Sequence, residues 1–203
     1  MNNFLTALEY EKSQQKMADD FYKKVFGDDL IEIKRWDYNK DEYSRSMQKK
    51  GIDVTLKVRK ISKNGPIELE YNISEKFRMN DWDDMFIELY SKFPNTIGWG
   101  HQYNADYIAY FMDSEMYIVN NQHLTSLVES ISHQLSKDFL SSIFSSKGND
   151  SYIYSYRNKT VKVFKIPTYI NHKLVWEGVG VCIKWKDLDD LGVYINKHKL
   201  WKK

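Results

Sequence analysis

Hydrophobic and polar residues alternate along the chain in patterns that predict both helices and strands. Residues 3–26 place apolar side chains at near-helical spacing, and Gly27 can adopt the left-handed conformation that ends many helices. Residues 30–36 alternate with period two, as a short strand does. The polar segment 37–50 predicts a loop or a helical turn. The first quarter therefore reads as a helix followed by a strand.

The next two apolar segments predict a β-hairpin. Residues 52–58 and 67–77 both alternate with period two, and the pair Asn64-Gly65 lies between them. Asn-Gly favours the tight turns that join antiparallel strands. We expect these two segments to be antiparallel neighbours.

Helix signals follow the hairpin. Asn80 or Asp81 can cap a helix that runs through about Ser91, with aspartates in its first turn and Pro94 closing it. A second, longer helix is predicted from about Gln122 to Ser146, where leucine, valine and isoleucine form one stripe.

Strands account for the rest of the chain. Residues 106–120 predict two strands, and residues 151–167 and 173–185 predict more, with a short hairpin at Asn158-Lys159. Helix and strand segments alternate, so the expected fold class is α/β or α+β, with a central mixed sheet flanked by helices.

Composition sets outer limits on the class of protein. A chain of 203 residues suits one domain, and a hydrophobic fraction of 42% is typical of a folded globule. Cys182 is the single cysteine and cannot form an internal disulfide, and no secretory signal is recognised, so a reducing cytoplasm is expected. Apolar runs are shorter than the roughly 20 residues of a membrane span. We expect no membrane partner.

Charge is unevenly distributed although the net charge is only +2. Residues 157–203 contain eleven Lys and Arg against four Asp and Glu, among tryptophans and tyrosines such as Trp176, Trp185, Trp201 and Tyr169. Such a segment can follow a phosphate backbone and stack on bases, or it can be a solvated surface over a core of aromatic residues. The second interpretation is the more common one.

Two carboxylates of the predicted hairpin suggest chemistry. Asp53 stands at the mouth of the first strand, and Glu75 continues the inward face of Ile67, Leu69, Tyr71 and Ile73 on the second. An ionised carboxylate on an inward face costs several kcal/mol unless a cation or a metal accompanies it. Two acids on neighbouring strands with Lys76 alongside can hold Mg²⁺ at a phosphodiester.

At this point the chain resembles a known family. The order of helix, strand, Asp strand, Glu/Lys strand and helix, with GID at 51–53 and SEK at 74–76, is similar to the PD-(D/E)XK nuclease superfamily. The segments QKKGID, ISEKFR and DWDDMFIELYS and the pair Gly98-Trp99 resemble small phage and bacterial proteins assigned to that superfamily. The resemblance covers about residues 5–120. It implies a restriction-endonuclease-like core within a single nuclease-like domain, residues 1–203, whose sheet is extended by the basic aromatic residues 150–203.

The resemblance also implies roles for particular residues. Asp53 matches the first metal-binding acid, Glu75 the second acid, and Lys76 the basic residue that orients water or stabilises charge. Gln48 falls where relatives carry a glutamine near the site, and Glu88, on the predicted helix, is an additional acid. A further acid from the first helix, Glu11 or Asp20, stays open. The implied cofactor is Mg²⁺ or Mn²⁺, held by Asp53 and Glu75.

One position departs from the pattern of the superfamily. There the second acid and the lysine are separated by one residue, which puts both on one side of the strand. Here Glu75 and Lys76 are consecutive, and Ser74 occupies the expected position of the acid. Either a β-bulge near Ser74 re-aims Glu75, or the site has decayed. The bulge is the interpretation that we favour.

Two functions remain on the sequence alone. The first is a metal-dependent nuclease that hydrolyses DNA phosphodiester bonds. The alternative is a non-catalytic protein on a degraded nuclease fold, such as a phage-type inhibitor, that binds nucleic acid or a host protein. Whether the chain forms a homodimer stays open.

Overall fold

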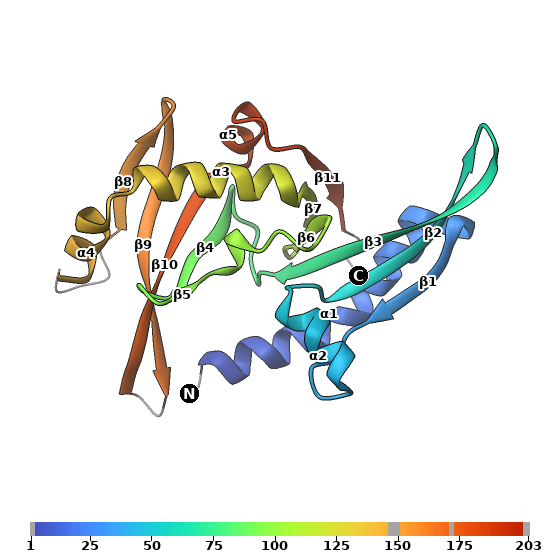
Figure 1. The fold of residues 1–203 in the computed structure, drawn as a ribbon, viewed down its shortest axis with the longest axis horizontal. Coiled ribbons are helices and arrows are strands. Elements are labelled where there is room, and N and C mark those ends of the chain that lie inside the picture. The colour runs from blue at the N-terminus through green and yellow to red at the C-terminus, as the bar shows by residue number, and fades with distance from the viewer. Residues whose placement is uncertain (1–2, 146–150, 171–172, 201–203) are drawn as a thin grey trace. The chain divides into compact units, whose positions relative to one another are not determined.

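The structure is a computed structural model, and it describes residues 3–145, 151–170 and 173–200 (Figure 1). The fold is mixed α+β, as the sequence predicts. The chain divides into two compact units, each named here after its sheet. The six-stranded unit comprises residues 7–81, 103–121 and 195–203, and the five-stranded unit comprises residues 1–6, 82–102 and 122–194.

The six-stranded unit carries the hairpin with Asp53 and Glu75. Its described elements are α1 (Asn3–Phe26), η1 (Gly27–Asp29), β1 (Leu30–Arg35), α2 (Glu42–Lys49), β2 (Val54–Ser62), β3 (Gly65–Phe77), β6 (Tyr107–Phe111), β7 (Glu115–Asn120) and β11 (Ile195–Lys199). The strand order is β1-β2-β3-β6-β7-β11, in which only β3 and β6 are parallel among the described pairs. The predicted mixed sheet is confirmed.

Helix α1 covers the apolar face of this sheet. Ala18, Phe21 and Tyr22 are buried against a cluster that includes Leu56 and Ile73 of the hairpin. A leucine, isoleucine or phenylalanine side chain contributes about 1.5–3 kcal/mol when fully buried. The apolar stripe of residues 3–26 and the alternation of the hairpin strands therefore meet in one core, which fixes β2 and β3 under α1.

The predicted hairpin is confirmed in its pairing, and its two turn residues are Lys63 and Asn64, with Gly65 as the first residue of β3. β2 and β3 pair antiparallel from Val54 opposite Ile73 to Ser62 opposite Gly65. Gly65 has a φ of +108°, which a residue with a Cβ rarely adopts. The turn of Lys63 and Asn64, followed by Gly65, closes the ribbon at the end away from Asp53.

Helix α2 forms where a loop or a helical turn was predicted. The Asp41 carboxylate accepts a hydrogen bond of 2.6 Å from the Ser44 N–H, which caps the first turn. Met47 packs in a small buried cluster with Trp36, Ile52 and Ala105. This cluster holds α2 beside the start of β2.

The five-stranded unit has its own sheet. Its described elements are β4 (Asp84–Lys92), β5 (Thr96–Ile97), η2 (Trp99–His101), α3 (Asn121–Gln134), α4 (Lys137–Ser145), β8 (Ser151–Tyr156), β9 (Lys159–Ile170), β10 (Lys173–Lys184) and α5 (Trp185–Asp190). The strands run in the order β5-β4-β10-β9-β8 and are antiparallel. Strands β8, β9 and β10 thus build a second sheet instead of extending the first, and β11 alone of the described strands after residue 150 adds to the six-stranded one.

The helix predicted from Asn80 or Asp81 to Ser91 is wrong. Residues Asp84–Lys92 form strand β4, in which Met85, Ile87 and Leu89 are fully buried and the residues between them are half-buried. The aspartates before it resemble a helix start, but period-two burial between β5 and β10 overrides that local signal. Asp81 instead accepts hydrogen bonds from the N–H and the hydroxyl of Ser114.

The long helix predicted from Gln122 to Ser146 is two helices. α3 ends at Gln134 and α4 begins at Lys137, while Ser146 lies outside the described residues. The Ser136 hydroxyl accepts a hydrogen bond of 3.0 Å from the Phe139 N–H, the contact of a helix N-cap. The serine-rich sequence therefore starts a new helix in place of prolonging the first.

The aromatic residues of the C-terminal segment divide between core and surface. Trp185 is buried and donates its indole N–H to the Trp82 carbonyl oxygen, and Tyr156 is also buried. Tyr169 is exposed, and Trp201 lies outside the described residues. Trp185 and Tyr156 thus agree with the second interpretation of this segment, in which the aromatic residues belong to the core.

No helix in residues 3–145, 151–170 or 173–200 is both long enough and apolar enough to cross a membrane.

Gly98 offers a test of how tightly the five-stranded unit is packed. A Cβ at this position would lie 2.3 Å from the Glu88 carbonyl oxygen of β4, so that the backbone must shift. We predict that Gly98→Ala lowers the free energy of unfolding by about 1–3 kcal/mol. Urea denaturation measures this. Asn95→Ala, at an exposed position of the turn between β4 and β5, is the control, and equal stabilities of the two variants would contradict the packing.

Candidate functional site

Asp53 is held at the point where three strands meet. Its N–H donates to the Ile73 carbonyl oxygen of β3 at 2.9 Å, and its carbonyl oxygen accepts the Trp36 N–H at 3.0 Å. The backbone of Asp53 is therefore fixed on both sides just before β2 begins. Its side chain therefore starts from a fixed backbone position directly before the first residue of β2, Val54.

The Asp53 carboxylate accepts hydrogen bonds from three neutral donors, one of which is the Ser74 hydroxyl at 3.4 Å from Oδ2. Oδ2 accepts the Glu75 N–H at 2.7 Å, and Oδ1 accepts the Gln48 side-chain amide at 3.1 Å. The same Gln48 nitrogen donates to the Trp36 carbonyl oxygen at 2.7 Å. Gln48, a predicted site residue, thus lies at Asp53 and connects it to helix α2.

Lys76 lies on the same face as Asp53. Its Nζ is 3.9 Å from Asp53 Oδ2, and it donates to Ser74 Oγ at 3.0 Å and to the Glu75 carbonyl oxygen at 3.1 Å. The side chains of Lys76 and Asp53 are 24% and 27% exposed, so solvent reaches both. A carboxylate, a hydroxyl and a carbonyl oxygen therefore surround one cation at a half-exposed position.

Glu75 faces the opposite side of β3. Its side chain is only 2% exposed, and its carboxylate accepts hydrogen bonds from Arg35 Nη1 at 2.7 Å and Nη2 at 3.2 Å. The Tyr22 hydroxyl of α1 donates to Oε1 at 2.9 Å. Glu75 is thus buried between helix α1 and strand β1, with both carboxylate oxygens occupied.

Burial and pairing act in opposite directions on the proton affinities of this cluster. Burial raises the pKa of Glu75, and the hydrogen bonds and charge of Arg35 offset part of that rise. Burial acts to lower the pKa of Arg35, but the hydrogen bonds from its guanidinium to Glu75 and Asp19 outweigh this and raise it. Burial, and then the charge of Glu75, raises the pKa of Tyr22, which stays a neutral donor.

The first helix contributes an acid, but not one of those expected. Asp19 Oδ1 lies 2.8 Å from Arg35 Nη2 and accepts a hydrogen bond from Arg35 Nε. Asp20 is exposed and pairs with Lys23 instead, and the side chain of Glu11 lies outside those described. Asp19 therefore supports Arg35 and reaches the candidate site only through it.

The β-bulge expected near Ser74 is absent from the described pairing. Residues Ile73–Phe77 of β3 pair with β6 one to one, without a register shift. Consecutive side chains therefore keep to opposite faces, with Ser74 and Lys76 beside Asp53 and Glu75 beneath α1. The structure brings Asp53, Gln48 and Lys76 together and does not bring the carboxylates of Asp53 and Glu75 to one place.

Glu88, the additional acid that the resemblance implies, lies on a strand and not on the predicted helix. It lies in β4, which belongs to the five-stranded unit, whereas Asp53 and Lys76 belong to the six-stranded one. The helix that was expected to carry it toward the site does not exist, because residues 84–92 form a strand. In the part of the chain that the structure describes, no group of three or more His, Cys, Asp or Glu side chains is arranged to hold a metal ion.

Arg35, Tyr22 and Asp19 are the residues that the sequence interpretation missed. Arg35 follows Ile33 by two positions in β1, so it lies on the inward face as Glu75 does in β3. The sequence signal for this ion pair was that Arg35 and Glu75, which have opposite charges, both occupy inward positions of predicted strands. The partners are separated by 40 residues, so spacing alone did not pair them.

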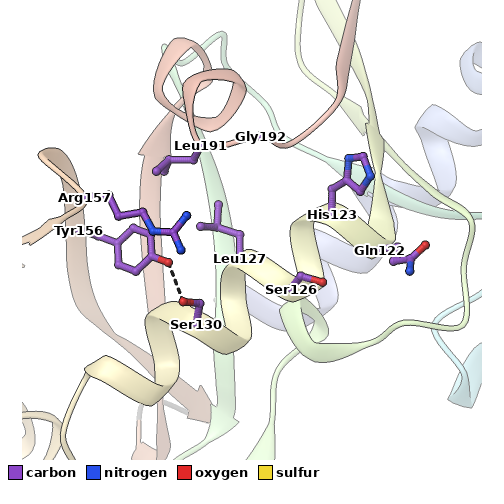
Figure 2. Close-up of a pocket in the computed structure, with 9 residues that line it drawn as sticks. All are labelled: Gln122, His123, Ser126, Leu127, Ser130, Tyr156, Arg157, Leu191 and Gly192. Carbon is purple, nitrogen blue, oxygen red and sulfur yellow. Dashed lines mark hydrogen bonds between the residues drawn. The ribbon is translucent and has the colours of Figure 1, made fainter.

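A separate pocket lies within the five-stranded unit. It has a volume of about 360 Å³ and lies between α3, the β8–β9 turn and the residues after α5 (Figure 2). Figure 2 shows the Tyr156 hydroxyl at the edge of this pocket, 2.6 Å from Ser130 Oγ. Arg157 and His123 line it, but none of its lining residues is an acid, so it offers no carboxylate for a metal ion.

Searches of protein-family models, curated proteins and solved structures found nothing that matches the chain.

The buried ion pair predicts a strong effect on stability. Arg35→Met leaves Glu75 buried without a cation, so the free energy of unfolding at neutral pH is expected to fall by about 3–5 kcal/mol. The double variant Arg35→Met/Glu75→Gln is expected to recover much of this, because no buried charge remains. Urea denaturation of the wild type and the variants measures the difference.

The same pair predicts a dependence of stability on pH. The folded pKa of Glu75 is raised, so between its unfolded and folded pKa values the folded state binds more protons and stability falls as pH rises. Loss of Arg35 raises that pKa further. The deficit of Arg35→Met should therefore shrink as pH falls from the folded pKa of Glu75 in the variant to that in the wild type, and a deficit independent of pH would contradict the assignment.

Proposed function

We propose that the chain is a metal-dependent nuclease that hydrolyses DNA phosphodiester bonds at the cluster of Asp53, Ser74 and Lys76. The observation that supports this most is the position of Lys76 Nζ, 3.9 Å from the Asp53 carboxylate on a half-exposed face at the mouth of the hairpin. A carboxylate and a lysine in this relation, on the strands where the superfamily carries them, fit the resemblance of the sequence.

The donor set of the cluster suits a hard divalent cation. Asp53 Oδ2, Ser74 Oγ and the Glu75 carbonyl oxygen are all oxygens, and they already surround the Lys76 ammonium. Mg²⁺ in proteins is commonly bound by one or two carboxylates, with water and substrate phosphate completing its shell. Such an ion would polarise the phosphate and lower the pKa of a bound water.

The metal ligands in this proposal therefore differ from those expected at first. Asp53 stays as the carboxylate ligand, and Ser74 and the backbone of Glu75 replace the Glu75 side chain. That side chain serves the fold through Arg35 and Tyr22. Gln48 holds Asp53 Oδ1, which leaves Oδ2 directed toward the cluster.

The Lys76 ammonium can occupy two positions, one among the three oxygens and one beside a bound phosphate. Its flexible stem lets Nζ leave the three oxygens and move toward a bound phosphate, where it can orient water or balance the charge that develops. Its side chain is partly exposed, so this movement does not have to open the core.

A second function is favoured by Ser74. A serine where the superfamily has an acid leaves one carboxylate on this face, and Lys76 already neutralises it. In this alternative the cluster is a structural ion pair, and the protein binds nucleic acid or a host protein without cleaving it. The two functions differ in whether a divalent ion can replace the ammonium.

Cleavage assays separate the two functions. We predict that the wild type nicks or degrades DNA with Mg²⁺ or Mn²⁺, that Asp53→Asn reduces cleavage to background, and that Lys76→Met reduces the rate about 100-fold or more. Asp20→Asn, at an exposed position of α1, is the control and is expected to cleave normally.

Glu75→Gln provides the sharper comparison. It is expected to lower stability yet retain cleavage below its melting temperature, because the carbonyl oxygen of residue 75 remains. If a folded Glu75→Gln variant lost cleavage, the Glu75 carboxylate would have to take part in the reaction. Binding of DNA without cleavage by the wild type under all metal conditions would support the alternative.

A further inference from the structure

Two tyrosine rings near Asp53 are largely exposed to solvent. Tyr38 precedes helix α2 and is 48% exposed, and Tyr43 in its first turn is 62% exposed. A tyrosine ring gains free energy when it is covered, and two such rings on one short segment form a surface that a ligand can cover.

Cations and a third ring accompany these tyrosines. The Arg45 guanidinium lies 5.3 Å from the centre of the Tyr38 ring, and Lys34 Nζ lies 4.4 Å from the Trp36 ring. The Trp36 and Tyr43 rings meet edge to face, with their centres 5.2 Å apart. Aromatic and cationic side chains therefore alternate across this surface.

The net charge of this surface is positive. Residues 34–50 contain six Lys and Arg against three Asp and Glu, and only Arg35 among the cations pairs inward with Glu75. Two of the three acids, Asp37 and Asp41, accept backbone N–H groups of Asn39 and Ser44. The remaining cations include Arg45, the exposed Lys49 at the end of α2, and the exposed Lys50 that follows it. An anionic ligand is the one that this charge favours.

The surface is attached rigidly to the candidate site. Gln48 of α2 donates to both the Trp36 carbonyl oxygen and Asp53 Oδ1, and the buried cluster of Trp36, Met47, Ile52 and Ala105 anchors the helix from beneath. A ligand that lies on α2 therefore lies next to Asp53, on a support that does not have to rearrange.

We propose that Tyr38, Tyr43 and Arg45 form a binding surface for single-stranded nucleic acid, with bases stacked on the tyrosine rings and phosphates at the cations. This proposal rests on the proposed function, because the nucleic-acid strand bound at this surface is the one that reaches Asp53. Bases in a duplex are stacked on one another and cannot cover these rings, whereas unpaired bases can. Single strands are thereby the substrate class.

Binding is measured apart from cleavage by fluorescence anisotropy in EDTA. The probes are labelled oligo(dT) and oligo(U) of about 20 nucleotides and a DNA duplex of the same length. We expect the wild type to prefer single strands over the duplex. Tyr38→Ala/Tyr43→Ala is expected to weaken single-strand binding about 20-fold or more, since stacking is lost at two bases. The oligo(dT) and oligo(U) arms decide between DNA and RNA.

Two variants make the result specific to stacking. Tyr38→Phe/Tyr43→Phe keeps both rings and is expected to bind as the wild type does. Tyr194→Ala removes a ring that is 57% exposed in the other unit and is also expected to bind normally. Equal affinity of the Ala and Phe double variants, or a preference for the duplex, would overturn the proposal.

The failure of this proposal is distinct from the failure of the nuclease function. Asp53→Asn is expected to bind single strands as the wild type does while it loses cleavage. A wild type that binds through the tyrosines but never cleaves would refute hydrolysis and leave the surface in place. Cleavage of single strands that is unaffected in Tyr38→Ala/Tyr43→Ala would refute the surface alone.

Discussion

The ion pair between Arg35 and Glu75 determines what strand β3 can present on its other face. Glu75 is almost fully buried, and without a cation its charge would cost several kcal/mol. Arg35 and Tyr22 hold the side chain under α1, so the backbone at residue 75 is fixed as well. That backbone donates its N–H to Asp53 and offers its carbonyl oxygen to Lys76. A single residue thereby joins the core on one side of the sheet to the polar cluster on the other.

The polar cluster is in effect a cation site that already contains a cation. Three oxygens from Asp53, Ser74 and the Glu75 backbone surround the Lys76 ammonium. A divalent ion can take that position only if the free energy gained from its two charges exceeds the free energy needed to displace the Lys76 ammonium. A second carboxylate on this face would favour the metal, whereas Ser74 contributes a neutral hydroxyl.

Much of the fold was accessible from local patterns, because α1, the β2–β3 hairpin and the pair β6–β7 follow from periodicity and turn residues within each segment. The errors arose where a local signal competed with burial. The aspartates before residue 84 suggest a helix, yet β4 alternates buried Met85, Ile87 and Leu89 in a central strand. The closeness of Gln48 to Asp53 was suggested by the resemblance. The pairing of Glu75 with Arg35 was not, because contacts between distant residues leave no trace in spacing.

The two compact units are interleaved along the chain. The six-stranded sheet begins with β1 at Leu30, but its last described strand, β11, starts at Ile195, after the whole five-stranded sheet has been specified. During synthesis, the edge of β7 that β11 will cover stays open until the other unit has left the ribosome. No single cut in the sequence separates the units, so a fragment that contains Asp53 and Lys76 but stops before residue 195 would expose that edge to strand pairing between molecules.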